Sequence, residues 1–339
     1  MQRVSDQQIG AYLRQHAIAG LDGALRIEPL PADFDGQRFR VSSGSVRAVL
    51  KRYSSASVES ARREIAGLHL GSGVGLAPAL LLGDEAGEGL GGPVVVYEEP
   101  AGTALGSEPL DAGSVQGWLF LLLTLHHLPT TGVTLSSSMS QDAATWWQRT
   151  QAAWSECRAA YGEATFGPLM QALSRLHAIV GARIEANRGL WNGVTRRLCH
   201  GNPVPAHMVR AGGRLMLIEW EGFGLGDPAM EVGRAAALAA LSGEIDADQY
   251  VHFVADYLAG MRDLRDTTLE NRLHIFASVL PLGFCFVVLR LLAQRGALSA
   301  AERERSIAQV TRALMWIQDT LGVEAGDPAT LLAPLRQLA

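Results

Sequence analysis

The residues whose types and spacing could do chemistry gather between positions 196 and 234. Two imidazoles, an amide and a carboxylate stand there: His200, Asn202, His207 and Glu219. Carboxylate oxygens suit hard cations such as Mg²⁺, whereas imidazole suits Zn²⁺ better. Asparagine is neutral and cannot take a proton, although its carbonyl oxygen can position a hydroxyl. Groups of these types could face a ligand at the ends of the strands that carry them.

Short strands and turns must hold these side chains in place. Two apolar runs, Arg197–Cys199 and Leu215–Glu219, each end on groups that could face a ligand. The tight-turn sequence Ala211-Gly212-Gly213 between them predicts a hairpin. Gly226-Asp227-Pro228 then forms a turn before a helix. The predicted layout is therefore strand, polar loop, hairpin, acidic residue, turn and helix.

One lysine stands out among the basic residues. The chain has 28 arginines and a single lysine, Lys51, which ends the apolar strand sequence Val49-Leu50-Lys51. A lone lysine can arise by chance. It can also mark a site that needs a compact ammonium, because a planar guanidinium does not replace it there.

The N-terminal third predicts a small five-stranded antiparallel sheet that carries one helix, and the remainder is mainly helical. Alternating and apolar runs predict strands at Ala24–Leu30, Arg38–Ser43, Val46–Arg52, Ala79–Leu82 and Pro93–Glu98. Helices are predicted at 5–20, Ser57–Leu70, Val115–Leu128, Ala143–Tyr161, Gly167–Arg188, 229–241, 246–264, 268–294 and 299–321. The fourth of these carries Trp146, Trp147 and Trp154, for which core packing is the plain interpretation and ligand stacking the alternative.

The stretch from 196 to 234 resembles the core of the aminoglycoside phosphotransferase and choline kinase family, the small-molecule branch of the protein-kinase-like fold. That family reads roughly His-Gly-Asp, four residues, Asn, a hairpin ending Ile-Asp-Trp-Glu, and Gly-Asp-Pro. Here the frame reads His200-Gly201-Asn202, His207, Ile218-Glu219-Trp220-Glu221 and Gly226-Asp227-Pro228. The resemblance implies an α+β, two-lobed fold, with a nucleotide-binding sheet lobe over 1–100 and a larger helical lobe over 101–339.

The resemblance also implies a nucleotide site. Lys51 would hold the phosphates of ATP and pair with Glu64, 13 residues further on, with Glu59 as the fallback partner. A surface lysine and a solvated glutamate form the plain alternative. In relatives the adenine ring bonds a hinge, which falls here near Tyr97–Pro100, with Tyr97 and Glu98 as the implied binding residues. ATP and Mg²⁺ are thus the implied cofactors.

The same frame places the catalytic and metal positions, and three of them depart from the family. His200 and Asn202 fall in the catalytic loop, where Asn202 replaces the Asp that takes the hydroxyl proton. His207 replaces an Asn that binds Mg²⁺, and a hydrogen-bonded loop histidine is the plain alternative. Glu219 replaces the main metal-binding Asp and is one methylene longer, which shifts its carboxylate by about 1.5 Å.

Together these departures predict a kinase-fold protein with impaired or lost phosphoryl transfer, which binds a nucleotide or small molecule between its lobes. The loop at 31–37 supports this interpretation, because one Gly, two Asp and one Pro make a poor phosphate cradle. Two alternatives stay open: an active ATP-dependent phosphotransferase acting on a small-molecule hydroxyl, and a non-enzymatic assembly partner that uses the apolar helix near 274–293.

Composition bears on the cellular compartment of the protein and on whether it binds nucleic acid or a membrane. A net charge of −5 gives no case for nucleic-acid binding. The most apolar run, Ile275–Leu289, holds Pro281 and Gly283 and is shorter than the roughly 20 residues of a membrane span, so it predicts a buried helix. Three cysteines without metal spacing and a polar start predict a cytoplasmic protein with reduced thiols.

Overall fold

The computed structural model describes residues 3–32, 35–106, 108–138, 142–161, 163–294 and 298–337. It divides into two compact units. The first holds 1–107, 116–139 and 197–226, and the second holds 108–115, 140–196 and 227–339. The first unit thus joins the N-terminal sheet with the stretch around the candidate site, whereas a lobe boundary at residue 100 stays a prediction.

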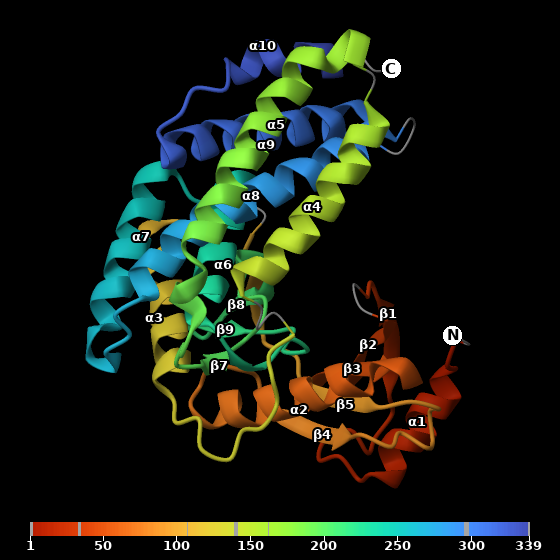
Figure 1. Cartoon of the computed structure of the whole chain (residues 1–339). Coiled ribbons are helices and arrows are strands. Elements are labelled where there is room, and N and C mark those ends of the chain that lie inside the picture. Colours follow the sequence, from red (N-terminus) through yellow and green to blue (C-terminus); the bar gives the residue numbers. More distant parts are fainter. Residues whose placement is uncertain are drawn as a thin grey trace. The chain divides into compact units, whose positions relative to one another are not determined.

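The first unit is built on a five-stranded antiparallel sheet of order β1-β2-β3-β5-β4 (Figure 1). Its strands are β1 (Arg26–Leu30), β2 (Gly36–Ser43), β3 (Val46–Tyr53), β4 (Leu80–Asp84) and β5 (Val94–Glu98). Helices α1 (Asp6–Gln15) and α2 (Val58–Gly73) belong to the same unit, and α2 packs against β4 and β5. The predicted small sheet lobe of an α+β fold is confirmed.

The central strands of the sheet are buried on both faces. Every residue of β3 from Ala48 to Tyr53 is buried, as a central strand with two covered faces requires. The turn before β3 pairs Ser43 with Val46 and places Gly44 at φ 56°, a conformation that glycine adopts without strain. Phe39, Leu50 and side chains of α1 complete the core on one face of the sheet.

Five shorter strands frame the stretch that the sequence marks as chemical. They are β6 (Gly102–Ala104), β7 (Arg197–Cys199), β8 (Met208–Ala211), β9 (Arg214–Leu217) and β10 (Gly224–Gly226). The predicted hairpin is confirmed as β8–β9, and β6 adds a third strand to it, while β7 pairs with β10. Gly201 must be glycine, because its φ is 94° and a Cβ there would lie 2.5 Å from the carbonyl oxygen of Gly222.

The second unit is helical (Figure 1). Its helices are α4 (Ala143–Ala160), α5 (Glu163–Ala186), α6 (Pro228–Ser242), α7 (Ala247–Gly260), α8 (Leu269–Ala293), α9 (Ala300–Leu321) and α10 (Pro328–Leu332), and α3 (Ala112–His127) precedes them in the chain. α8 packs against α4, α6 and α9. By length and composition α8 could cross a membrane, but 67% of its most apolar window is buried in the structure, as in the core helix of a soluble protein.

Asp227, from the Gly-Asp-Pro turn, is the N-cap residue of α6. Its carboxylate accepts a hydrogen bond from the backbone N–H of Ala229, and Pro228 takes the first helical position. The buried guanidinium of Arg272 donates to the same carboxylate from Nε at 3.0 Å and from Nη2 at 3.1 Å, and it also pairs with Asp266. These contacts give Asp227 a structural role within the second unit.

Candidate functional site

The lone lysine lies at the centre of a buried charge cluster. Lys51 is fully buried near the end of β3, and its Nζ lies 2.7 Å from Glu64 on α2. The same ammonium lies 2.6 Å from Glu219 and 3.3 Å from Glu221, which follow β9. The structure therefore brings together the predicted pair Lys51–Glu64 and the predicted metal position Glu219.

A second cation completes the cluster, and sequence reasoning missed it. Nη1 of Arg38 on β2 lies 2.6 Å from Oε1 of Glu219, while Lys51 holds Oε2. Arg38 and Lys51 reach the same carboxylate because they are paired across β2 and β3. The hairpin turn that pairs Ser43 with Val46 fixes this register. Counting back from the predicted turn would therefore have placed Arg38 opposite Lys51.

The conformation of Glu219 aims its carboxylate into this cluster. Its φ of 65° lies in the left-handed region, which non-glycine residues seldom adopt. Tertiary contacts must maintain such a conformation, and they do so here through neighbouring residues. The ring Nε2 of buried His200 lies 2.9 Å from the carbonyl oxygen of Ile218, and the His200 ring packs edge-on against Trp220.

Burial and charge set the pKa values in the cluster. Burial alone would lower the pKa of Lys51, but the carboxylates around it, that of Glu64 first, raise this pKa well above its ordinary value, so the ammonium stays charged. Burial, opposed by the charge of Lys51 and assisted by Glu221, raises the pKa of Glu64 to about 7. The hydroxyl of Tyr53 donates a hydrogen bond to the second oxygen of Glu64.

We expect the raised pKa of Glu64 to give stability a measurable pH dependence. Between its ordinary value of 4.5 and about 7, the folded protein holds this proton and the unfolded chain does not. Stability from this group is therefore present at low pH and is lost as pH rises through that window, with a slope of at most about 1.4 kcal/mol per pH unit. Urea unfolding at a series of pH values measures it.

The matched variants for this prediction lie on one helix. Glu64→Gln removes the titrating group and should flatten the decline of the unfolding free energy between these pH values. Glu59→Gln removes an exposed carboxylate of α2 that lies beside Arg62. In this variant the unfolding free energy should depend on pH as steeply as in the parent. Equal slopes in the parent and in Glu64→Gln would show that Glu64 titrates at its ordinary pKa.

The loop that contains the other predicted site residues is held by its own backbone. Nδ1 of His207 lies 2.9 Å from the carbonyl oxygen of Asn202, and the backbone N–H of Val204 donates to the same oxygen. The N–H of Asn202 donates to Nδ1 of His200 at 3.3 Å. This geometry favours a loop-bracing role for His207 and His200, and it leaves Asn202 half-buried at the turn.

The predicted hinge residues differ in exposure. Tyr97 is buried at the end of β5, opposite Val49, whereas Glu98 is exposed. Of the loop at 31–37, Asp33 and Phe34 lie outside the described residues. Asp35 accepts hydrogen bonds from the hydroxyls of Ser54 and Ser57, and these bonds lower the pKa of its carboxyl.

The cluster contains acidic side chains but does not fit the Mg²⁺ that the fold family uses. One carboxylate oxygen from each of Glu64, Glu219 and Glu221 lies within 4.8 Å of the others, so acidic ligands are at hand. However, Mg²⁺ requires near-octahedral oxygens at about 2.0–2.1 Å, and Lys51 contacts all three carboxylates. With Arg38 on its other oxygen, Glu219 is fully engaged by cations. As arranged, these residues do not fit Mg²⁺.

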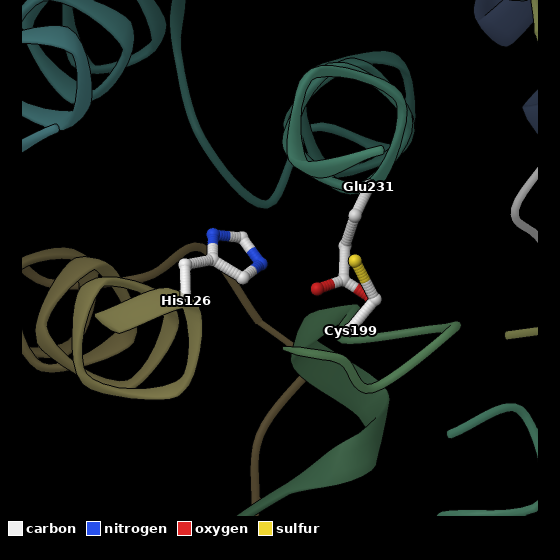
Figure 2. Close-up of side chains that lie close together, drawn as sticks. All are labelled: His126, Cys199 and Glu231. Atoms are coloured by element: carbon white, nitrogen blue, oxygen red, sulfur yellow. The ribbon is translucent and has the colours of Figure 1, made fainter. Parts of the chain in front are cut away.

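A separate pair of possible ligands lies in the same unit. His126 on α3 and Cys199 on β7 present a ring nitrogen and a sulfur within 4.8 Å of each other, and both residues are buried (Figure 2). The third residue drawn, Glu231, is on α6 of the second unit. Two donors do not complete the four-coordinate set of a zinc site, so we assign no metal to this pair.

The fold and the site define a protein-kinase-like class: a small antiparallel sheet with a buried Lys–Glu pair, followed by a hairpin and a mainly helical part. The model of the phosphotransferase enzyme family matches residues 26–266, and the chain belongs to that family. A search of curated protein sequences finds no match.

Solved structures carry the same fold. A candidate aminoglycoside phosphotransferase from Ralstonia eutropha is similar with a TM-score of 0.64 at 13% identity, over 95% of this chain and 100% of that one. A choline/ethanolamine kinase family protein from Mesorhizobium loti gives 0.56 at 17%, over 98% and 99%. The choline kinase of Streptococcus pneumoniae gives 0.55 at 16%, over 91% and 99%. At these identities the likeness concerns the fold.

Proposed function

We propose that this chain is a phosphotransferase-family protein with impaired phosphoryl transfer, which binds a nucleotide through Lys51 without needing Mg²⁺. One observation carries the proposal: both carboxylate oxygens of Glu219 are held by cations of the chain, Lys51 at 2.6 Å and Arg38 at 2.6 Å. The negative charge of Glu219, the residue at the main metal position, is thus compensated by two cations of the chain itself. Asn202 adds to this, because it cannot take the proton that the family's Asp takes.

Of the two cations, Arg38 is the one that a phosphate can reach in this structure, because Lys51 has no exposed surface. Phosphate oxygens prefer cationic partners, and a guanidinium binds them in a bidentate manner. The side chain of Arg38 is 22% exposed, so a phosphate can compete with Glu219 for it. In this arrangement the chain's own cations, rather than Mg²⁺, compensate the phosphate charge. A cytoplasmic location and a small-molecule second ligand belong to the same proposal.

Thermal unfolding with ATP, with and without Mg²⁺, tests the proposal. A ligand at 100 times its Kd adds about 2.7 kcal/mol of stability. We expect ATP to stabilise the parent chain to the same extent with EDTA as with Mg²⁺. Stabilisation that requires Mg²⁺ would instead support an active metal-dependent enzyme, and no stabilisation under either condition would reject the nucleotide site.

We predict that Arg38→Gln makes ATP binding sensitive to Mg²⁺. The change frees Oε1 of Glu219, so the carboxylate can approach a metal ion, and Mg²⁺ should then enlarge the ATP-induced shift of Tm. Arg40→Gln is the matched control, because Arg40 is on the same strand but pairs with Glu99. It should behave as the parent. Mg²⁺ sensitivity in both variants, or in neither, would contradict the role assigned to Arg38.

A second candidate function is an active ATP-dependent phosphotransferase. The observation that favours it is the intact contact between Lys51 and Glu64 at 2.7 Å, a pair that active kinases of this fold require. In this case Glu219 would move from its cations to a metal ion when Mg·ATP binds. A phosphoryl-transfer assay with amino-alcohol and aminoglycoside acceptors separates the two, because Glu219→Ala should abolish turnover only if Glu219 carries the metal.

A further inference from the structure

An apolar cavity of about 270 Å³ lies within the second unit. The helices α4, α6 and α8 form its wall, with side chains such as Leu241, Val279 and Phe284. Small-molecule sites usually have apolar walls with a few polar groups and volumes from about 300 Å³ upward, and this cavity is close to the lower limit. The cavity holds none of the residues of the charge cluster around Lys51, so it is a separate feature of the molecule.

The polar side chains that line the cavity are hydrogen-bond donors, and each is either positively charged or neutral. Arg149 and Arg234 both line the cavity, and the guanidinium of Arg149 lies over the ring of Trp146 at 5.3 Å from its centre. The hydroxyl of Thr150 donates to the carbonyl oxygen of Trp146. Among the described residues that line the cavity, no side chain is acidic.

The charge balance of the wall favours an anion. Burial lowers the pKa of Arg234, and the charge of Glu231, which does not line the cavity, opposes this effect. A carboxylate in the cavity would meet two guanidinium groups and no acidic side chain of the described lining, and charge-assisted hydrogen bonds between guanidinium and carboxylate are strong in a low-dielectric site. The apolar remainder of the cavity suits a hydrocarbon body.

We propose that this cavity binds a small amphipathic carboxylate, with its hydrocarbon body against α6 and α8 and its carboxylate at Arg149 and Arg234. The site does not depend on the proposed nucleotide site, and its test needs no nucleotide. The probes are octanoate, 1-octanol and octylammonium, which share one chain and differ in charge.

Isothermal titration of the full chain measures the three affinities. We expect octanoate to bind about tenfold more tightly than 1-octanol, which corresponds to one charge-assisted hydrogen-bonded pair, and octylammonium to bind most weakly. Equal affinity for octanoate and 1-octanol would overturn the anion site. Absence of octanoate binding at millimolar concentration would overturn the cavity as a ligand site.

Two matched pairs of variants place the ligand. Arg149→Gln should weaken octanoate about tenfold and leave 1-octanol unchanged. Arg158→Gln is its control, because Arg158 is on the same helix and lies over Trp154 but does not line the cavity. Ala153→Phe fills the cavity and should remove binding of both probes, whereas Ala152→Phe is on the exposed side of α4 and should not. Octanoate affinity that is unchanged in Arg149→Gln and Ala153→Phe, with both variants folded by circular dichroism, would place the ligand elsewhere and overturn the proposal.

Discussion

Replacing Lys51 by Met should lower the free energy of unfolding by about 3–5 kcal/mol, the usual cost of breaking a buried ion pair from one side. The ammonium is fully buried and lies within 3.3 Å of three carboxylates. Without it, Glu219 keeps Arg38 but Glu64 is left as a buried carboxylate without a cationic partner. Chemical denaturation followed by circular dichroism measures the loss, and ATP-induced stabilisation should disappear in the same variant.

The pH dependence and a double variant separate charge from packing. Without Lys51, Glu64 can avoid a buried unpaired charge by binding a proton. Its pKa is already about 7 in the parent chain, so the loss of unfolding free energy in Lys51→Met should grow as pH rises above 7. Lys51→Met with Glu64→Gln removes the unpaired charge and should recover most of the stability. A double variant no more stable than Lys51→Met would assign the loss to packing instead.

Lys51→Arg adds a test of the lone lysine. The chain uses arginine at 28 other positions, so the genome offers no bias against it here. A guanidinium is larger than an ammonium and carries its donors in a plane, whereas Lys51 directs one nitrogen at three carboxylates from a site with no exposed surface. We therefore expect Lys51→Arg to fold with lower stability than the parent.

Local sequence signals predicted most of the fold and part of the site. The strands β1–β5 and the helices α2 to α9 follow their apolar periodicity, and the Gly212-Gly213 turn gave the β8–β9 hairpin. The pair Lys51–Glu64 could be predicted because the two residues are 13 positions apart, one at a strand end and one in the next helix. This is the spacing that the resemblance to the family implies. These features depend on residues that are close in sequence, where propensity and period decide the outcome.

Features that depend on distant residues were not predicted. The three-residue strand β6 has no periodic signal of its own and exists because β8 offers it an edge. The left-handed φ of Glu219 is imposed by tertiary contacts that no local pattern announces. Arg38 was hidden among 28 arginines, and only the register of β2 against β3 reveals that it shares a carboxylate with Lys51.

The proposed loss of phosphoryl transfer would link the departures at Asn202 and Glu219, because a metal ion at Glu219 and a base at position 202 would serve one reaction. Once Glu219 is paired with Lys51 and Arg38, its buried carboxylate is satisfied without a metal ion. The longer Glu side chain suits this pairing, because it lets the two oxygens reach two cations on adjacent strands.

Asn202→Asp combined with Glu219→Asp should raise Mg²⁺-dependent ATP hydrolysis by about 10²- to 10⁴-fold, the usual contribution of a general base. The first change supplies a group that can take a proton from water. The second shortens the carboxylate by about 1.5 Å, which withdraws it from Arg38 and Lys51 and leaves it available to a metal ion. Phosphate release from ATP, measured with and without Mg²⁺, reports the gain.

One single variant and two controls decide what the gain means. Asn202→Asp alone should give a smaller rise than the double variant, because Glu219 stays with its cations. Asn192→Asp makes the same charge change at an exposed position of the second unit and should give none. Adding Lys51→Met to the double variant should remove the gain, because the phosphates lose their buried cation. A double variant that binds Mg·ATP yet hydrolyses it at the parent rate would show that Asn202 does not stand at the base position, and the missing activity would then lie in the loop before β2 or in the acceptor site.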